Sequence, residues 1–289
     1  MTTIAARHVV ITGAASGIGR SVASRMADRA AAVSLVDIDE GRLARAVEGI
    51  RGAGGRACGY VCDVSDRQAV QGLARQITEE GGPVDILVNN AGVVSGGRLL
   101  DLTDQQIDRT FRVNVLALFW TTRAFLPTMI RRDTGHIVNI ASAAGLIGTR
   151  RETDYAASKH AVVGFDEALR MELRRLASHV RTTVVCPYYI DTGMFAGVRT
   201  RVPWLLPILK EERVAAQIVR AVETNRGRLL IPWPVHLVPV LREVLPLRVF
   251  DMVADALGVN DAMNEYRGRA TAGPEEQPAG TRVGAVPTS

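Results

Sequence analysis

The chain has 289 residues, of which 47% are hydrophobic and 22% are charged. This composition is that of an ordinary globular protein, and it excludes a collagen-like, coiled-coil or disordered body. Thirty-five basic and 30 acidic residues give a formal charge of +5, and no run of five basic residues occurs. The excess of basic residues is mild, so we expect no nucleic-acid partner.

Short apolar segments alternate with longer helical patterns along the first 230 residues. The apolar segments lack the polar alternation of half-exposed strands, so they predict strands buried on both faces of a parallel sheet. The predicted strands are His8–Thr12, Ala32–Val36, Gly59–Cys62, Ile86–Asn89, His136–Ile140, Thr182–Cys186 and Arg228–Ile231. The predicted helices are Ile18–Ala30, Arg42–Arg51, Arg67–Glu79, Gln105–Arg131, Tyr155–Arg175 and Glu211–Thr224. This order predicts an α/β fold, a doubly wound parallel sheet flanked by helices.

We expect a single domain over residues 1–270. An apolar insertion that contains prolines lies at about residues 193–210, and a second proline-rich stretch opens a C-terminal extension at about residues 231–270. Residues 271–289 consist largely of Gly, Pro, Ala, Thr and Glu, which predicts a disordered tail.

Targeting and metal-binding signals are weak in this sequence. The N-terminus has no long apolar stretch behind a basic start, so we expect neither a signal peptide nor a membrane anchor. We therefore expect a cytoplasmic location. The three cysteines and five histidines show no metal-ligand spacing, so no metal site is predicted.

A glycine-rich turn separates the first predicted strand from the first predicted helix. Its spacing is Gly13-x-x-x-Gly17-x-Gly19, with Ser16 and Ile18 on either side of the middle glycine. Glycine permits positive φ and close approach of the backbone, and the free N–H groups at a helix N-terminus favour a phosphate. The turn therefore predicts a dinucleotide phosphate site.

Asp37 ends the second predicted strand, eighteen residues after Gly19. A carboxylate there can accept hydrogen bonds from the adenosine ribose hydroxyls and would repel a 2′-phosphate, so it favours NAD over NADP. The alternative is that Asp37 only caps the next helix. Arg20, one residue after the last glycine, weakens the preference because it could help to neutralise a phosphate.

Tyr155 and Lys159 are four residues apart in a predicted helix and therefore lie on one face of it. A free tyrosine has a pKa of about 10, and a nearby ammonium group favours its phenolate form. The pair can thus exchange a proton near neutral pH. A solvated helix face is the alternative, but the chain has only two lysines and one of them is in this pair.

Together these motifs resemble the classical short-chain dehydrogenase/reductase family over about residues 5–230. The matching elements are Thr12-Gly13-x-x-x-Gly17-x-Gly19, Asp63-Val64, Asn89-Asn90-Ala91-Gly92, Asn114, Ser142 and Tyr155-x-x-x-Lys159. Ser142 precedes Tyr155 by thirteen residues, the spacing that the family uses. The resemblance implies a single Rossmann-like domain, a nicotinamide cofactor and an oxidoreductase that acts on CH–OH groups.

The resemblance also implies roles for four catalytic residues. Tyr155 would be the general acid/base, and Lys159 would hold the nicotinamide ribose and lower the pKa of the tyrosine. Ser142 would hydrogen-bond the substrate oxygen, and Asn114 would anchor a water that links Lys159 to solvent.

Further positions match cofactor contacts of that family. The cofactor residues implied are Gly13, Ser16, Gly17, Ile18, Gly19, Asp37, Asp63, Val64, Asn90, Ala91, Gly92, Tyr155, Lys159, Pro187, Ile190 and Thr192. One departure is Pro187-Tyr188, where family members usually have Pro-Gly. The bulk of the Tyr188 side chain would narrow the substrate cleft.

The C-terminal third resembles the retinol dehydrogenase and 17β-hydroxysteroid dehydrogenase branch, whose members use lipophilic alcohols and ketones. An apolar insertion over the cleft would act as a substrate lid that buries such a molecule. The alternative is that its apolar residues pack against the sheet or a partner subunit. The candidate substrate residues are Tyr188, Met194, Phe195 and Trp204.

The sequence thus predicts an NAD-dependent oxidoreductase that interconverts a lipophilic alcohol of retinoid, steroid or long-chain type and its ketone or aldehyde. Two alternatives stay open: an NADPH-dependent 3-oxoacyl thioester reductase, which Asp37 disfavours, and a non-catalytic nucleotide-sensing protein. The resemblance implies a homodimer or homotetramer built on the helices Gln105–Arg131 and Tyr155–Arg175. Peripheral membrane contact through Ile231–Leu247 is a less favoured alternative, because this stretch contains Arg242 and Glu243 and is short for a span.

Overall fold

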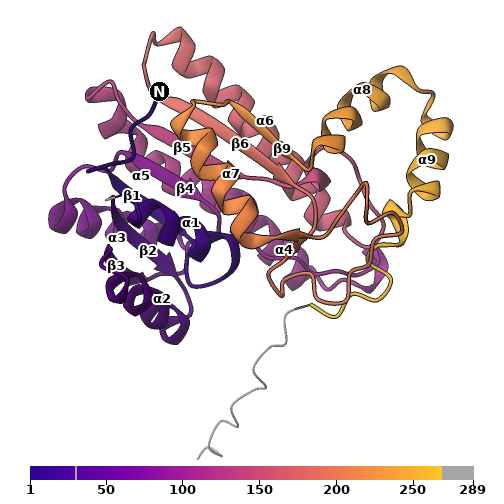
Figure 1. The fold of residues 1–289 in the computed structure, drawn as a ribbon, viewed down its shortest axis with the longest axis horizontal. Helices are drawn as coiled ribbons and strands as arrows, with labels where there is room; N and C mark the ends of the chain where they lie inside the picture. Colours follow the sequence, from indigo (N-terminus) through magenta and orange to yellow (C-terminus); the bar gives the residue numbers. More distant parts are fainter. Residues whose placement is uncertain (30, 269–289) are drawn as a thin grey trace, which may run out of the picture.

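Within residues 1–29 and 31–268, which the computed structural model describes, seven strands form one parallel sheet (Figure 1). Its strand order is β3-β2-β1-β4-β5-β6-β9, so the chain reverses its direction of travel across the sheet between β3 and β4. The strands are β1 (His8–Thr12), β2 (Ala32–Asp37), β3 (Arg56–Val61), β4 (Ile86–Asn89), β5 (His136–Ile140), β6 (Arg181–Pro187) and β9 (Arg228–Ile231). A crevice for a ligand is expected outside the carboxyl ends of β1 and β4, where the strand order reverses.

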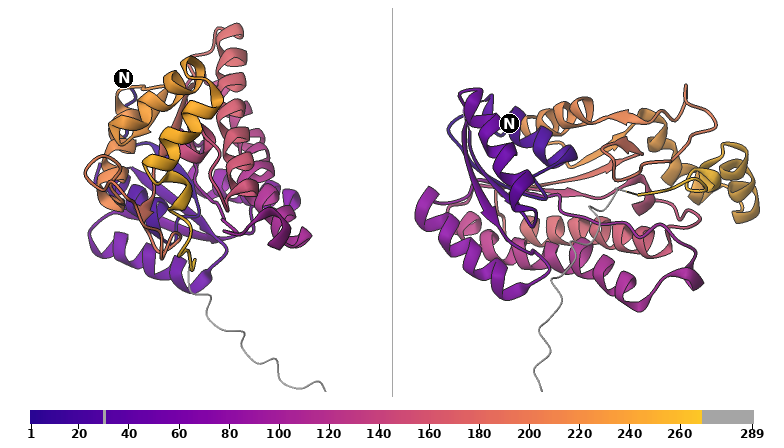
Figure 2. Two further views of the ribbon diagram at one scale, coloured as in Figure 1. Left: turned by 90° about the vertical axis from the view of Figure 1, so that its right-hand side faces the viewer. Right: turned by 90° about the horizontal axis from the view of Figure 1, so that it is seen from below.

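Helices cover both faces of this sheet, which lies between two helical layers (Figure 2). Helices α1, α2 and α7 share one buried cluster with the strands, and α3, α5 and α6 share another on the opposite face. The helices are α1 (Gly17–Ala27), α2 (Glu40–Gly52), α3 (Arg67–Gly81), α4 (Asp104–Phe111), α5 (Ala117–Arg131), α6 (Thr153–Arg175), α7 (Glu211–Glu223), α8 (Leu237–Val244) and α9 (Leu247–Ala256). The predicted doubly wound α/β class is confirmed.

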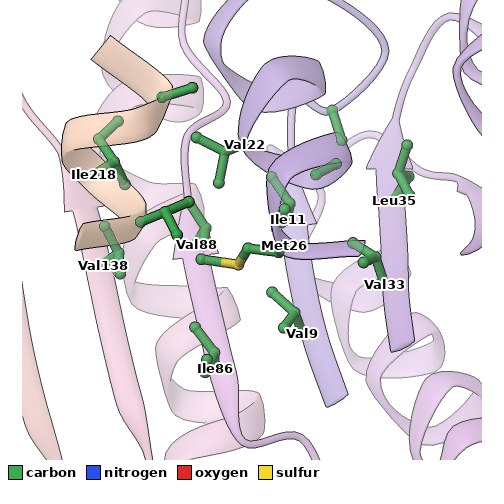
Figure 3. Close-up of a cluster of buried hydrophobic side chains, with 14 of the residues drawn as sticks. Val9, Ile11, Val22, Met26, Val33, Leu35, Ile86, Val88, Val138 and Ile218 are labelled. Atoms are coloured by element: carbon green, nitrogen blue, oxygen red, sulfur yellow. The ribbon is translucent and has the colours of Figure 1, made fainter. Parts of the chain in front are cut away.

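The core lies where the central strands meet the helices. Val9 and Ile11 of β1, Val22 and Met26 of α1 and Ile218 of α7 belong to one cluster, and all five side chains are almost completely buried (Figure 3). Every residue of β1, β4 and β5 is buried. The strands lack polar alternation because helices exclude water from both of their faces.

The largest error in the strand predictions is at β3. Its predicted start was Gly59, whereas the strand begins at Arg56. β3 is one of the two edge strands of the sheet, and only its residues Ala57 and Tyr60 are buried. The strand begins with Arg56 and its apolar pattern is interrupted by Gly59, so the apolar signal by which the other strands were found is short.

The predicted long helix Gln105–Arg131 is interrupted. Residues Arg112–Leu116 form a π-helical turn (η2) between α4 and α5, and this turn contains the buried Asn114. A π-turn inserts one extra residue into a helix and re-aims the side chains beside it, and such turns are frequent at functional sites.

The stretch Asp104–Arg131 is also, among the described residues, the one helical span long and apolar enough to cross a membrane by length and composition. In the fold it places Ala117, Phe125 and Met129 in the core beneath the sheet. A core helix of a globular fold passes the same test.

The C-terminal extension forms α8 and α9, which project from the body of the molecule at the right of Figure 1. The proline-rich pattern indicated no helices here, yet Pro246 is the N-cap of α9 and Pro239 lies in the first turn of α8. Proline is tolerated there because the first turn of a helix needs no N–H donors. The predicted tail, residues 271–289, lies outside the described residues.

The core predicts a pH dependence of stability at His136, which is fully buried in β5. The Thr183 hydroxyl donates to the Arg226 carbonyl and so accepts from His136 Nε2 at 2.8 Å. Burial lowers the pKa of His136 from 6.5 to about 4, with Arg181 adding to the effect. The folded state therefore favours the neutral ring, and this contribution to stability is present above pH 6.5 and lost as the pH falls towards 4.

Urea unfolding at pH 7 and at pH 4.5 tests this dependence. We expect the wild-type protein to lose on the order of 3 kcal/mol through this group, and His136→Gln to lose correspondingly less. His236→Gln is the matched control because His236 is exposed. An identical pH dependence in the wild type and His136→Gln would contradict the assignment.

Candidate active site

The glycine turn between β1 and α1 has the backbone geometry that the sequence predicted. Gly13 and Gly17 have φ values of +62° and +55°, which other residues rarely adopt. Ser16 is the N-cap of α1, and its side chain makes no cap hydrogen bond to the first turn. The Asn90 side-chain amide donates to the carbonyls of Thr12 and Gly13, each at 2.9 Å, and so fixes the shape of the turn from the neighbouring strand.

A cleft with a volume of about 440 Å³ runs along the carboxyl edge of the sheet. Asp37 and Asp63 line it together with the glycine turn, and Tyr155 and Lys159 line it from α6. The predicted cofactor residues that line this cleft are Gly13, Ser16, Gly17, Ile18, Asp37, Asp63, Val64, Asn90, Ala91, Gly92, Tyr155, Lys159, Pro187, Ile190 and Thr192. One pocket thus joins a phosphate-binding turn to a buried tyrosine–lysine pair, and these residues fit a dinucleotide cofactor.

Gly19 is the exception among the predicted cofactor residues, because it does not line the cleft. It packs behind the turn, where a Cβ atom would lie 2.3 Å from the Gly13 carbonyl oxygen and 2.5 Å from Asn90 Nδ2. Its role in this structure is to let α1 pack closely against the turn.

The alternative that the sequence left open for Asp37 is wrong, because the N-cap of α2 is Asp39, whose side chain accepts from the Arg42 N–H. Asp37 instead stabilises the backbone around the end of β2. Its Oδ2 accepts from the Ala15 N–H at 2.9 Å and its Oδ1 accepts from the Asp39 N–H at 3.1 Å. It also lines the cleft at the end of β2. The carboxylate therefore stabilises the local backbone and still presents its charge to the cleft.

Tyr155 and Lys159 lie on the buried face of α6, with exposed fractions of 5% and 4%. Lys159 Nζ is 5.6 Å from the centre of the Tyr155 ring and donates to the Ile140 carbonyl at 2.8 Å. Ser142 follows β5 and lines the same cleft, so the sheet edge and α6 bring the three predicted groups together.

Asn114 is held rigidly by the π-turn. Its Nδ2 donates to the Val93 carbonyl at 2.9 Å and to Ser158 Oγ at 3.0 Å, and its Oδ1 accepts from the Val93 N–H at 2.8 Å. A Cβ atom on Gly92 would lie 3.3 Å from Asn114 Oδ1 and 3.5 Å from Lys159 Nζ. The two side chains therefore converge on the space beside Gly92, and a water held there stays a prediction.

Burial dominates the titration of the tyrosine–lysine pair. It raises the pKa of Tyr155, the charge of Glu152 raises it further, and the hydrogen bond with Ser142 opposes the change. Burial lowers the pKa of Lys159 to about 8. The family resemblance implied a lowered tyrosine pKa, but in this structure loss of solvation outweighs the attraction of the ammonium group.

The insertion at residues 193–210 begins and ends at a small parallel sheet. Its two strands, β7 (Ile190–Asp191) and β8 (Leu209–Lys210), pair with each other and hold the ends of the loop together. Met194, Phe195 and Tyr188 line the cleft as predicted.

The prediction for Trp204 was wrong. Its side chain is 82% exposed and does not line the cleft. The N–H groups of Leu205 and Leu206 both bond to the Val202 carbonyl, which closes a turn. This turn buries Leu206 and leaves Trp204 on the outside.

Sequence reasoning missed several residues that line the cleft, Arg109 and Val113 among them, and three residues that pack around it. The Tyr189 ring packs edge-to-face on Phe195 at 5.1 Å, and Phe195 packs in the same way on Tyr155 at 5.8 Å. Tyr266 returns from the C-terminal extension, and its hydroxyl donates to the Val94 carbonyl at 3.4 Å. Glu152, three residues before Tyr155, is 1% exposed. Only the position of Glu152 next to the Tyr155 motif was a signal in the sequence.

A family model described as short chain dehydrogenase matches residues 7–203 of the chain. The chain belongs to this family. The dehydrogenase/reductase is 41% identical to short-chain dehydrogenase/reductase family 16C member 6 of Bos taurus, over 92% of this chain and 84% of that protein. It is 40% identical to epidermal retinol dehydrogenase 2 of Homo sapiens (91% and 86%) and 38% identical to retinol dehydrogenase 10 of Xenopus tropicalis (91% and 86%).

Solved structures of the same family superpose well on this dehydrogenase/reductase. One is a short chain dehydrogenase/reductase from Burkholderia phymatum in complex with NAD, with a TM-score of 0.75 and 33% identity over 88% of this chain and 97% of that one. Another is a metagenomic short-chain oxidoreductase in complex with NADP, with a TM-score of 0.68 and 28% identity over 80% and 98%. The protein is therefore an NAD(P)-dependent short-chain dehydrogenase/reductase.

The packing behind the turn predicts the effect of Gly19→Ala. The added Cβ would push the Gly13 carbonyl and the Asn90 amide out of place, so we expect the Kd for cofactor to rise roughly tenfold or more, which corresponds to about 1.4 kcal/mol. Titration with NADH followed by fluorescence measures it. Gly49→Ala is the control because a Cβ there would meet nothing within 4 Å. Unchanged affinity in Gly19→Ala would refute this role.

Proposed function

We propose that this dehydrogenase/reductase uses NAD to interconvert a lipophilic alcohol, of retinoid, steroid or long-chain type, and its aldehyde or ketone. The observation that carries the proposal is the apolar and aromatic wall beside Tyr155, to which Met194, Phe195 and Tyr188 contribute. Such a wall binds a substrate by burying its apolar surface, at about 25 cal/mol per Å². The names of relatives at 38–40% identity, which are retinol dehydrogenases, support the retinoid class first.

The charge at the end of β2 supports NAD over NADP. Asp37 presents a carboxylate to the cleft, and a 2′-phosphate placed against it would be repelled. Arg20, the residue that weakened this preference, pairs with Glu211 at 3.2 Å. Its positive charge is thus already compensated on the far side of the glycine turn.

The arrangement of the side chains supports proton transfer at the substrate oxygen. When bound, the nicotinamide supplies the hydride acceptor for alcohol oxidation or the hydride donor for carbonyl reduction. Tyr155 takes the hydroxyl proton in oxidation and returns it in reduction. Ser142 donates a hydrogen bond to the same oxygen, and the Lys159 ammonium group favours the phenolate of Tyr155. The buried wall excludes water from this exchange.

The insertion acts as a substrate lid in this proposal. It is held at its base by β7 and β8, and Gly197 packs so closely on the C-terminal segment that a Cβ atom would lie 2.0 Å from the Glu265 carbonyl. The lid would thus be supported from behind by residues of the extension. Val198 and Leu206 are buried, and Val198 packs with Tyr189, Ala262 and Met263, so part of the insertion is anchored on the C-terminal extension.

Peripheral membrane contact and a homodimer or homotetramer stay predictions, as does a cytoplasmic location. The exposed apolar side chains Trp233, Leu237, Val240 and Val244 of the extension support the membrane contact. The exposed Phe119 and Met171 on α5 and α6 support the oligomer.

Initial rates with NAD and a panel of retinol, a hydroxysteroid, a long-chain alcohol and ethanol test the proposed activity. We expect turnover of the lipophilic alcohols and at least a 100-fold loss in Tyr155→Phe, because the phenol is the proton acceptor. Cofactor affinity should stay within about threefold in that variant. Tyr60→Phe is the control, since Tyr60 bonds to Glu80 outside the cleft. Full activity in Tyr155→Phe would disprove the proposed role.

Asp37→Asn tests the cofactor preference. The amide keeps one hydrogen-bond acceptor for the local backbone but removes the charge, so we expect affinity for NADP to rise about tenfold or more while affinity for NAD falls. Matched titrations of NAD, NADH, NADP and NADPH on wild type and variant give the ratio. A wild-type preference for NADPH would reverse the assignment of Asp37.

The second candidate function is reduction of a 3-oxoacyl thioester with NADPH. It is favoured by one comparison: a variant of actinorhodin polyketide ketoreductase with NADPH, which is 32% identical over 80% of this chain with a TM-score of 0.73. NADPH preference together with acyl-thioester turnover would select this function. A non-catalytic nucleotide sensor is disfavoured because Ser142, Tyr155 and Lys159 all line one cleft, and Asn114 is present and buried behind it.

A further inference from the structure

Glu152 is a buried acid that the proposed reaction does not use. It is the N-cap residue of α6, three residues before Tyr155, and its side chain is 1% exposed. Among the described residues no cation lies within ion-pair distance of it. Arg150, two residues before it, donates to Asp261 instead, and the adjacent Arg151 donates to the main-chain carbonyls of residues 263 and 264.

The hydrogen bonds of Glu152 satisfy only one side of its carboxyl group. Oε2 accepts from the hydroxyls of Thr149 and Tyr189, the latter at 3.2 Å. Oε1 has no hydrogen-bond partner among the described residues. A buried carboxylate without a counter-ion is costly, so the protonated form is favoured. Burial accordingly raises the pKa of Glu152 to about 7, although both hydroxyls oppose the rise.

The charge state of Glu152 bears directly on Tyr155. A negative charge there raises the pKa of the Tyr155 phenol, and Tyr189 connects the two residues through its hydrogen bond to Glu152 and its contact with Phe195. Asp154, the other acid nearby, accepts from the Thr110 hydroxyl at 2.7 Å. The titratable groups that face this region are Asp154, Tyr155 and Lys159 from α6, Tyr188 and Tyr189 from the segment after β6, and Tyr266 from the C-terminal segment.

We propose that Glu152 is a titratable positioning residue for Tyr155: in its charged form it opposes loss of the phenolic proton, and in its neutral form it does not. The Glu152 proton exchanges with solvent and never reaches the substrate, so the residue acts only through Tyr155. This inference rests on the proposed role of Tyr155 as the general acid/base. Alcohol oxidation needs the Tyr155 phenolate, so Glu152 controls the pH dependence of this reaction although it lies outside the catalytic group.

The first test is the pH profile of alcohol oxidation in Glu152→Gln. Glutamine keeps the size and an acceptor for the Tyr189 hydroxyl but carries no charge, so we expect the acidic limb to move to lower pH by on the order of one unit. Tyr189→Phe removes the hydrogen bond to Glu152 but keeps the charge of Glu152, so the acidic limb of its pH profile should move much less. An unshifted limb in Glu152→Gln, or an equal shift in Tyr189→Phe, would overturn the proposal.

The second test needs no turnover. The protein has five tyrosines, so their Cζ resonances can be followed by NMR in ¹³C-tyrosine-labelled protein from pH 5 to 9, with Tyr155 assigned through Tyr155→Phe. We expect the Tyr155 resonance of the wild type to shift in two steps, one near neutral pH from Glu152 and one near pH 8 from Lys159, and only the second step to remain in Glu152→Gln. A flat wild-type resonance, or the same titration in the variant, would refute the coupling.

The two tests separate the two proposals. If no alcohol is oxidised, the proposed function fails, and the NMR titration alone decides whether Glu152 is coupled to Tyr155. If alcohols are oxidised but neither the resonance nor the acidic limb depends on Glu152, the function stands and the inference about Glu152 fails.

Discussion

The exclusion of water from both faces of the central sheet is the constraint on which the rest of the structure depends. Strands β1, β4 and β5 are buried along their whole length, so the polar side chains that they carry, such as His136 and Asn139, must find hydrogen-bond partners inside the protein. The chemistry is therefore confined to the carboxyl edge, where the strands end and the chain leaves the core. The glycine turn, Asp37 and Ser142 all follow a strand end, and α6 brings Tyr155 to the same edge.

The same exclusion of water governs the reactivity of the site. Burial raises the pKa of Tyr155 and Glu152 and lowers that of Lys159, which in each case favours the neutral form. Neutral groups are inexpensive to bury, but a proton-transfer site must also form a charged state. The positive charge of an oxidised nicotinamide would favour the phenolate in a medium of low dielectric constant.

The rigidity of the site comes from side-chain hydrogen bonds to the main chain. The Asn90 side-chain amide donates to two carbonyls of the glycine turn. The Asn114 side-chain amide donates to the Val93 carbonyl and to Ser158 Oγ. Each amide links elements that are far apart in the sequence, so the phosphate site and the proton-transfer site keep a fixed separation. Placing Asn114 requires the π-turn, whose irregular geometry the helical periodicity of residues 105–131 did not reveal.

The sequence by itself determined the sheet class and most strand positions, because these depend on local patterns such as short apolar runs. The glycine turn and the Tyr155–Lys159 spacing indicated part of the cleft, and the resemblance to a known family implied most of the other lining residues that were predicted. Tertiary structure decided the rest. The start of β3 lay outside its apolar signal, and a turn at Val202 placed Trp204 outside the cleft. The approach of Tyr266, and the burial of Glu152 without a counter-ion, result from long-range packing. Packing of this kind leaves no periodicity in the sequence, because the partners are separated by many residues and meet only in the folded chain.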